Sequence, residues 1–336
     1  MSRQLFQYHP VVGYHFVPGL RARVPHEGGG YLVRVNSSGF RCDHDFVPRR
    51  NDGGFRILLF GDSYSAGDGV SNADRFGDRL ERILPGVEVY NLALPGTGTD
   101  QHYLVWREFA RGLDHDLVVI AILVENIRRV AARFRTFQSD DGRRLVYAKP
   151  YFEIDAAGAM VLRHVPVPRD PIDPSEIPES EQEHVDRGGA LEPLRRLVNR
   201  MGPGLKDRIL RLSRYQPLPA YDSPESPSWR LMRTILATWI GEVRVPVVLF
   251  PIPLYHYVEE TASPAGYRAR FRELAAPPRV TVLDPLADFY RVPRADRRAF
   301  RFGSDPHPTP AAHRVLAHCL ARALAPLAGI SEVQAV

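Results

Sequence analysis

Cysteine is nearly absent from this sequence, because its 336 residues contain only Cys42 and Cys319. Two cysteines exclude a disulfide framework and a four-cysteine zinc site. Long hydrophobic runs are absent too, and no stretch approaches the roughly 18 apolar residues that a membrane span needs. The first residues hold no apolar run of signal-peptide length. We therefore expect a cytoplasmic chain that has no membrane partner.

Lysine is almost as rare, since 42 of the 44 basic residues are arginine and only Lys149 and Lys206 are lysine. The formal net charge of +5 could indicate a nucleic-acid partner. The arginines are scattered along the chain, however, and no platform of aromatic and basic side chains is present. We expect no nucleic-acid partner, although arginine forks suit an anionic substrate.

Five short apolar runs have the length of β-strands, and helical patterns separate them. The runs are residues 56–60, 88–92, 117–123, 245–250 and 280–283. They are continuous rather than alternating, which indicates strands buried on both faces, as in a parallel sheet. The alternation predicts a three-layer α/β/α fold with a doubly wound, mainly parallel, five-stranded sheet. Ligands of such folds bind at the carboxyl ends of the strands.

Two regions do not follow this alternation. Residues 1–50, rich in Gly, Pro, Tyr and His, are predicted to form a lead-in that wraps the core with short strands. Residues 140–225 form an insertion that starts with a β-hairpin over residues 151–162 and continues as a helical, basic segment to Arg214. Its length favours a lid or substrate region, and a disordered surface insert is the alternative. The catalytic domain would span residues 51–330.

Ser63 follows the first apolar run directly, in the segment Gly61-Asp-Ser63, where a buried strand turns into a helix. The backbone N–H groups at such a turn favour negative charge, which suits a nucleophile whose product is an oxyanion. The glycine spacing fits neither a P-loop nor a dinucleotide-binding loop, so no cofactor is expected. The histidines show no ligand spacing such as His-Glu-x-x-His, so no metal is expected either.

Three further loops at strand ends supply partners for Ser63. The Gly96 N–H and the Asn126 amide could each donate a hydrogen bond to one substrate oxygen. Near the C-terminus, His307 could act as the general base for Ser63, with Asp305 orienting its imidazole.

A competing histidine, His313, lies inside the predicted final helix over residues 309–324. That position within a helix favours a structural role.

These blocks resemble those of the SGNH (GDSL-type) hydrolase superfamily. The match is closest at Gly61-Asp-Ser63 and at Asn91 with Gly96, five residues later. Residues 34–41 resemble a lead-in that precedes the first block in a bacterial subgroup. The resemblance implies a flavodoxin-like fold and a nucleophilic Ser63. It also implies oxyanion-hole donors at Ser63, Gly96 and Asn126, and a histidine–aspartate pair near the C-terminus.

Two departures from the family pattern stand out. The third block is usually Gly-x-Asn-Asp, whereas here it reads Val-Glu125-Asn126-Ile, so a carboxylate lies beside the oxyanion donor or points away from it. The fourth block usually separates Asp and His by three positions, whereas Asp305 and His307 are two apart. Ser304 occupies the usual Asp position, which leaves a Ser–His dyad as an alternative.

The predicted function is serine-dependent hydrolysis of an acetyl-type ester through an acyl-enzyme on Ser63. The substrate would be a small molecule or glycan, a carbohydrate or secondary metabolite. An O-acyltransferase with the same site is one alternative, and a binding module without turnover is another. The residues predicted to contact substrate are Asp62, which also suits a brace for its loop, Tyr64, Glu125 and Tyr151.

Overall fold

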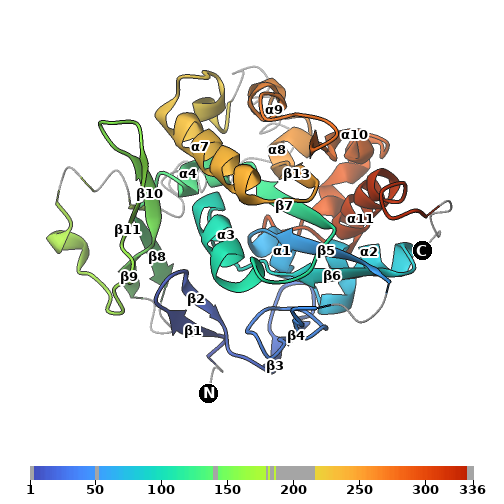
Figure 1. The fold of residues 1–336 in the computed structure, drawn as a ribbon, viewed down its shortest axis with the longest axis horizontal. Coiled ribbons are helices and arrows are strands. Elements are labelled where there is room, and N and C mark those ends of the chain that lie inside the picture. Colours follow the sequence, from blue (N-terminus) through green and yellow to red (C-terminus); the bar gives the residue numbers. More distant parts are fainter. Residues whose placement is uncertain are drawn as a thin grey trace.

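The computed structural model describes residues 4–49, 53–138, 143–178, 181, 185–186 and 216–330. Its centre is a five-stranded sheet with the order β14-β13-β7-β5-β6 (Figure 1). The strands are β5 (Phe55–Phe60), β6 (Val87–Asn91), β7 (Leu117–Leu123), β13 (Val247–Ile252) and β14 (Val280–Val282). Every neighbouring pair is parallel. The predicted sheet and the α/β class are confirmed.

The central strands β7 and β13 are buried along their whole length. Their Val, Ile and Leu side chains suit this position because helices cover both faces of the sheet. On one face, Phe60 packs against Trp239 of α7 (Pro227–Glu242), with ring centroids 5.1 Å apart. On the other face, Phe250 packs against Phe76 of α2 (Phe76–Ile83), with centroids 6.0 Å apart. The sheet is therefore doubly wound.

Other helices complete the two outer layers. They are α1 (Ser63–Ala66), α3 (Thr99–Val105) with a π-helical turn (Trp106–Ala110), α4 (Asn126–Arg129), α8 (Tyr255–Val258), α9 (Ala265–Arg272), α10 (Leu286–Phe289) and α11 (Pro310–Leu324). Short 3₁₀ segments lie at Asn72–Asp74, Pro174–Glu176, Pro219–Tyr221 and Arg294–Phe300. Helix α11, the predicted final helix, packs on α2, and α3 packs on α7. His313 is fully buried in α11, where its Nδ1 accepts the Phe76 N–H.

The insertion forms two small sheets beside the core (Figure 1). Strands β8 (Phe134–Gln138), β9 (Arg144–Ala148) and β12 (Val185–Asp186) make one, in the order β12-β8-β9. Strands β10 (Tyr151–Ile154) and β11 (Met160–Arg163) make the predicted hairpin, which is confirmed. Strand β8 precedes residue 140, so its small sheet includes residues upstream of the predicted insertion. The helical segment predicted to end at Arg214 lies outside the described residues.

The N-terminal lead-in consists of two hairpins that lie below the sheet in Figure 1. Strands β1 (Phe6–His9) and β2 (Gly13–Phe16) form the first, and β3 (Arg21–Val24) and β4 (Tyr31–Arg34) form the second. Side chains of this segment are buried in the main core, including Val12, Phe16, Val33 and Phe40. The lead-in therefore folds onto the α/β unit.

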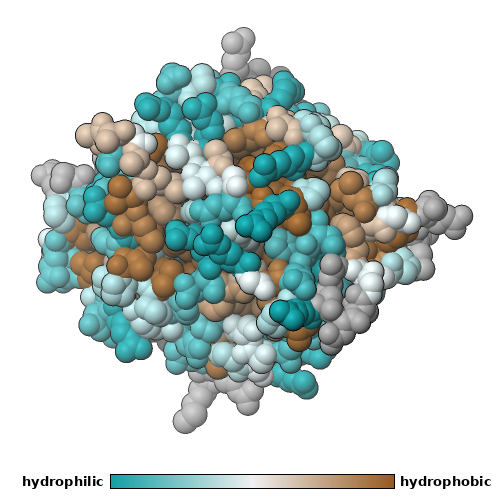
Figure 2. Space-filling view, viewed as in Figure 1, coloured by the Kyte–Doolittle hydropathy of each residue, from teal (hydrophilic) through white to brown (hydrophobic). Residues whose placement is uncertain are grey.

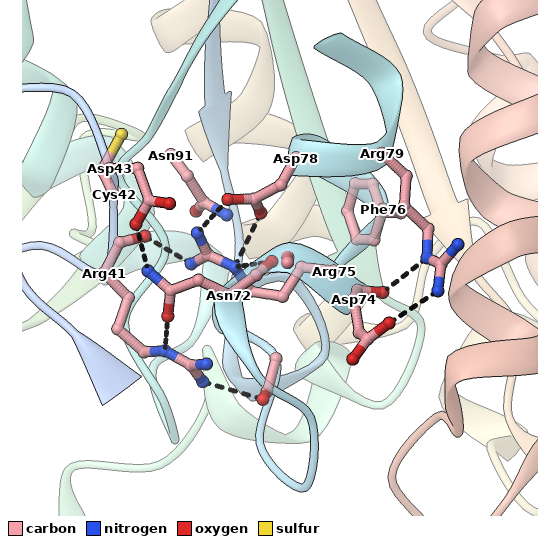
Figure 3. A network of polar contacts seen from close by, with 12 residues as sticks. Arg41, Cys42, Asp43, Asn72, Asp74, Arg75, Phe76, Asp78, Arg79 and Asn91 are labelled. Carbon is pink, nitrogen blue, oxygen red and sulfur yellow. Dashed lines mark hydrogen bonds and ion pairs between the residues drawn. The ribbon is translucent and has the colours of Figure 1, made fainter. Parts of the chain in front are cut away.

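Arg41 ties the lead-in to the chain just after the first helix (Figure 3). Its guanidinium is buried and donates to the carbonyls of Gly67 and Val70, both at 2.8 Å, and to the Asn72 side chain at 3.0 Å. Arg75 donates in turn to the Arg41 carbonyl and pairs with Asp78. Burial lowers the pKa of Arg41 to about 9, so it stays charged at neutral pH.

Hydrophilic side chains separate several hydrophobic patches on the face that Figure 2 shows. The large hydrophobic side chains that are exposed are Leu32, Val47, Phe137, Val165 and Leu327. Scattered exposure of this kind is usual for a globular chain and indicates no docking surface by itself. None of the helices among the described residues is long and apolar enough to cross a bilayer.

We predict that Arg41→Ala lowers the free energy of unfolding by about 3 kcal/mol, because buried carbonyls lose their charged donor. Urea unfolding followed by circular dichroism measures this. Arg34→Ala is the matched control, since the Arg34 side chain is exposed and pairs with Asp43 at 3.4 Å. Its effect should stay within about 1 kcal/mol. Equal losses in the two variants would contradict the anchoring role of Arg41.

Candidate active site

Ser63 stands at the start of α1, and two residues separate it from the end of β5. The Asp62 carboxylate caps this helix by accepting the Tyr64 N–H at 3.0 Å. Gly61 is required by space, because a Cβ there would lie 2.3 Å from the Ser65 Oγ. This tight turn holds Ser63 at the carboxyl end of the sheet, with only 5% of the residue exposed.

The structure brings Ser63, His307 and Asp305 into one line. The Ser63 Oγ lies 2.9 Å from His307 Nε2. On the other side of the ring, His307 Nδ1 forms a short hydrogen bond with Asp305 Oδ1. A carboxylate can only accept, so Nδ1 carries the proton and Nε2 is left to accept from the Ser63 hydroxyl. This is the geometry of a nucleophile with its general base and orienting acid.

The two-residue offset is compatible with this geometry because Asp305 folds back onto the residue it orients. Its Oδ1 accepts the His307 backbone N–H at 2.9 Å as well as the ring proton. Ser304 is exposed, and its backbone N–H donates to Glu27. The hydrogen-bond partner of His307 is therefore Asp305, not Ser304.

Charges around His307 tune its basicity. Burial lowers the pKa of His307, but the hydrogen bond to Asp305 and the negative charges of Asp68 and Asp62 outweigh burial and raise it above 6.5. Burial opposes ionisation of Asp305 too, yet its bonds with His307 and His26 hold its pKa well below the ordinary value. Asp68 carried no signal in the sequence, because it is placed here only by folding.

Gly96 has a left-handed backbone, with φ of +75°, at the turn after β6. A Cβ at this position would lie 2.7 Å from a nitrogen of the Arg135 guanidinium and 3.1 Å from the Tyr14 hydroxyl. Tyr14 also donates to the Pro95 carbonyl at 2.6 Å. The left-handed backbone favours glycine here, and these side chains leave little space for a Cβ.

Asn126 opens α4 directly after β7 and is fully buried. Its amide nitrogen and oxygen have no hydrogen-bond partner among the described residues, although the amide lies near enough to Asp62 to favour its ionised form. Buried polar groups normally have partners. An amide left open beside the nucleophile loop fits a donor kept for the oxygen of a bound substrate. Asn91 differs, since it braces α1 through the Ser65 carbonyl at 3.0 Å.

A model of the GDSL-like lipase/acylhydrolase family matches residues 59–315. The chain belongs to this family. The resemblance seen in the sequence motifs is thereby confirmed, and the chain is a serine hydrolase of the GDSL type, a family of esterases and acyl hydrolases. No curated protein matches the chain in sequence.

Several solved structures are similar to this GDSL-type hydrolase at low identity. A member of the lipolytic G-D-S-L family from Veillonella parvula is 10% identical, covers 80% of this chain and 97% of its own, and has a TM-score of 0.40. A lipase/acylhydrolase from Enterococcus faecalis is 15% identical, covers 84% of this chain and 100% of its own, and has a TM-score of 0.42. A salicylyl-acyltransferase from a tetracycline biosynthetic pathway is 13% identical, covers 85% of this chain and 59% of its own, and has a TM-score of 0.40.

Arg129 joins the three loops of the GDSL site that carry the predicted oxyanion donors. It lies one helical turn after Asn126, and its guanidinium contacts the buried Asp62 carboxylate at 3.3 Å and the Thr97 carbonyl at 3.1 Å. Lys149, in turn, donates to the Arg129 carbonyl at 3.0 Å. Burial raises the pKa of Asp62, and the Arg129 charge opposes that rise. No sequence motif indicated Arg129, and the missing acidic residue after Asn126 was the one available hint.

The four residues predicted to contact substrate have different positions. Asp62 and Tyr64 are buried and bond to loops of the site: Asp62 caps α1, and the Tyr64 hydroxyl donates to the Pro306 carbonyl at 3.0 Å. Substrate contact by either residue stays a prediction. Glu125 is half-buried and pairs with Arg128 at 3.4 Å.

Tyr151 is 8% exposed and lines a cavity of about 660 Å³ between the β10–β11 hairpin and α7. Its ring lies under the Arg133 guanidinium, 5.2 Å from the ring centroid. The same cavity is lined by Phe152, Glu153 and Arg230. Substrate contact by Tyr151 and Glu125 stays a prediction.

We predict that Arg129→Met lowers the kcat of ester hydrolysis by about 100-fold while leaving KM nearly unchanged, because misplaced oxyanion donors weaken transition-state binding alone. Steady-state kinetics with p-nitrophenyl acetate measures both constants. Arg128→Met is the control, since that side chain is half exposed at the rim and pairs with Glu125. An unchanged kcat in Arg129→Met would show that the three loops hold their places without it.

We also predict that kcat/KM falls at acid pH as His307 takes up a proton, with a midpoint above 6.5 because the pKa of His307 is raised. Asp68→Asn removes one of the negative charges that raise this pKa, so the midpoint should move to lower pH. The pH dependence of kcat/KM in the two proteins measures the shift. A midpoint that stays in place or moves up would contradict the effect of Asp68.

Proposed function

We propose that this GDSL-type hydrolase cleaves a short-acyl, acetyl-type carboxylic ester through an acyl-enzyme on Ser63. The observation that carries the proposal is the hydrogen-bonded line from the Ser63 Oγ through His307 to Asp305, beside the open Asn126 amide. A nucleophile, a base of fixed tautomer and an unsatisfied donor together supply what acyl transfer requires.

In the first half-reaction, the Ser63 Oγ attacks the ester carbonyl carbon while its proton passes to His307 Nε2. The Ser63 and Gly96 N–H groups and the Asn126 amide donate to the resulting oxyanion. Such a donor is worth roughly 3–4 kcal/mol in the transition state. Collapse then breaks the bond to the alkoxy oxygen, which leaves with the proton from His307.

In the second half-reaction, water attacks the acyl-enzyme and gives its proton to His307. Collapse of the second tetrahedral intermediate breaks the acyl–Oγ bond, and the proton returns to Ser63. The carboxylic acid is released and the enzyme is restored. Throughout, Asp305 accepts the Nδ1 proton of His307, which stabilises the imidazolium that forms in each half-reaction.

The limited space around the Ser63 hydroxyl supports a short acyl group. Ser63 is only 5% exposed. A short acyl group reaches so enclosed a hydroxyl more readily than a long acyl chain does.

The cavity that Tyr151 lines supports a polar alcohol part of the substrate. Its lining includes Val130, four residues after Asn126, and combines the Tyr151 and Phe152 rings with the charged Glu153 and Arg230 side chains. Aromatic faces next to charged hydrogen-bonding groups suit a polyhydroxylated ring. We therefore propose a carbohydrate or a hydroxylated secondary metabolite as the alcohol component.

A fluorophosphonate probe tests the catalytic assignment. We expect stoichiometric labelling of the wild-type protein at Ser63, and no labelling and no hydrolysis of p-nitrophenyl acetate in Ser63→Ala. Ser304→Ala is the matched control, because that exposed hydroxyl lies beside Asp305 without contacting His307, and it should label and turn over like the wild type. Absence of labelling in the wild-type protein would instead indicate a binding module.

Acyl length and acceptor are tested with p-nitrophenyl esters. The kcat/KM for the acetate should exceed that for the octanoate, and a preference for octanoate would overturn the short-acyl assignment. Product analysis with added sugar alcohols separates the two reaction types. Release of acetate indicates a hydrolase, whereas acetylated sugar as the main product indicates an O-acyltransferase.

A further inference from the structure

A second histidine contacts the acidic residue of the proposed triad. His26 lies in the connection between β3 and β4, and its Nε2 is 3.0 Å from the Asp305 Oδ2. Its side chain is only 11% exposed. The ring is held edge-on by Phe302 at 4.4 Å and by Tyr31 at 5.9 Å between ring centroids. The contact is therefore enclosed and fixed, although 279 positions separate the two residues.

The second ring nitrogen of His26 determines which atom carries the proton. His26 Nδ1 accepts the Gly28 backbone N–H at 3.1 Å, so this nitrogen uses a lone pair and carries no hydrogen. The proton of the neutral ring is then on Nε2, which points at Asp305. His26 therefore donates to the carboxylate as a neutral group.

The two donors occupy different oxygens of Asp305. Its Oδ1 accepts from the ring and the backbone of His307, and its Oδ2 accepts from His26. A carboxylate bonded through one oxygen can rotate about its Cβ–Cγ bond, whereas one bonded on both sides cannot. Asp305 is thus locked in the plane that suits the His307 ring.

The next residue of the lead-in holds the backbone of the same loop. The Glu27 carboxylate accepts the N–H groups of Ser304, at 2.9 Å, and Asp305, at 2.7 Å. These backbone hydrogen bonds lower the pKa of Glu27, so it is ionised at neutral pH. Two adjacent residues therefore hold both the side chain and the main chain of Asp305, in a segment that is neither helix nor strand.

We propose that His26 is a positioning residue for the hydrolase reaction and forms a line of four with Ser63, His307 and Asp305, while Glu27 anchors the loop. The inference rests on the proposed function, in which Asp305 orients His307. Without the lead-in, Asp305 would turn away from His307 for part of the time. His307 would then no longer be held in the tautomer that carries its proton on Nδ1. The lead-in is therefore part of the active site.

Loss of the His26 donor also changes the charge that His307 senses. The titratable and charged groups that face Asp305 are His307, Asp68, Tyr64, Tyr31, His26 and Glu27. Arg298 donates to the Phe302 and Gly303 carbonyls of the same loop. An Asp305 carboxylate that turns away for part of the time supports the His307 proton less, because its hydrogen bond and charge raise the pKa of His307. His307 then gives up that proton at lower pH.

The test compares His26→Leu, which fills the ring site without a donor, with His26→Gln, which restores a neutral N–H at similar reach. We expect His26→Leu to lower the kcat for p-nitrophenyl acetate by about tenfold and to move the acid limb of kcat/KM to lower pH. His26→Gln should recover both. A wild-type kcat and pH profile in His26→Leu would overturn the proposal, as would a loss of kcat with an unchanged profile that His26→Gln fails to rescue.

Two further variants distinguish a folding defect from a wrong proposal, and a wrong positioning role from a wrong mechanism. If His26→Leu does not fold, His26→Asn is compared with His26→Gln instead, because the shorter asparagine side chain is polar but does not reach Asp305. Ser63→Ala reports on the proposed function itself. Turnover in Ser63→Ala would remove the whole mechanism, whereas an inactive Ser63→Ala beside a fully active His26→Leu would remove only the positioning role.

Discussion

The hydrogen bond between Asp305 and His307 is the interaction on which the rest of the site depends. It sets the tautomer of the histidine and leaves Nε2 free to accept from Ser63. Neither residue belongs to a helix or a strand, so no regular backbone pattern fixes the distance between them. Contacts from elsewhere hold the loop instead: the Tyr64 hydroxyl bonds the Pro306 carbonyl, and Glu27 bonds two backbone N–H groups.

Buried arginines hold the other loops of the site in a similar way. Arg41 anchors the chain after α1, and Arg129 connects the loops of Asp62 and Thr97. Arg297 does the same near the C-terminal loops, through the carbonyls of Val258 and Val292. A guanidinium has five donors in a rigid plane, so one side chain satisfies several carbonyls at once. Part of the arginine surplus in this chain therefore serves loop structure.

Prediction from the sequence succeeded where the signal is local. The five strands, the hairpin and the final helix follow from apolar runs and periodicity, because strands covered on both faces must be hydrophobic throughout. Ser63, Gly96, Asn126 and His307 were singled out as candidates because each follows a strand or precedes a helix within a short motif. His26, Glu27, Asp68 and Arg129 carry no such motif. They lie far along the chain from their partners or depend on which way a side chain points.

The sequence by itself determined the class of the fold and the chemical groups available at the carboxyl ends of its strands, since both are written in short, contiguous patterns. Only the tertiary structure decided how those groups are connected. It placed Asp305 rather than Ser304 against His307, buried Asp62 and Tyr64, and brought His26 to the second oxygen of Asp305. The physical reason is that hydrogen bonds between distant segments depend on distances of a few ångströms, which chain folding sets and local sequence does not encode.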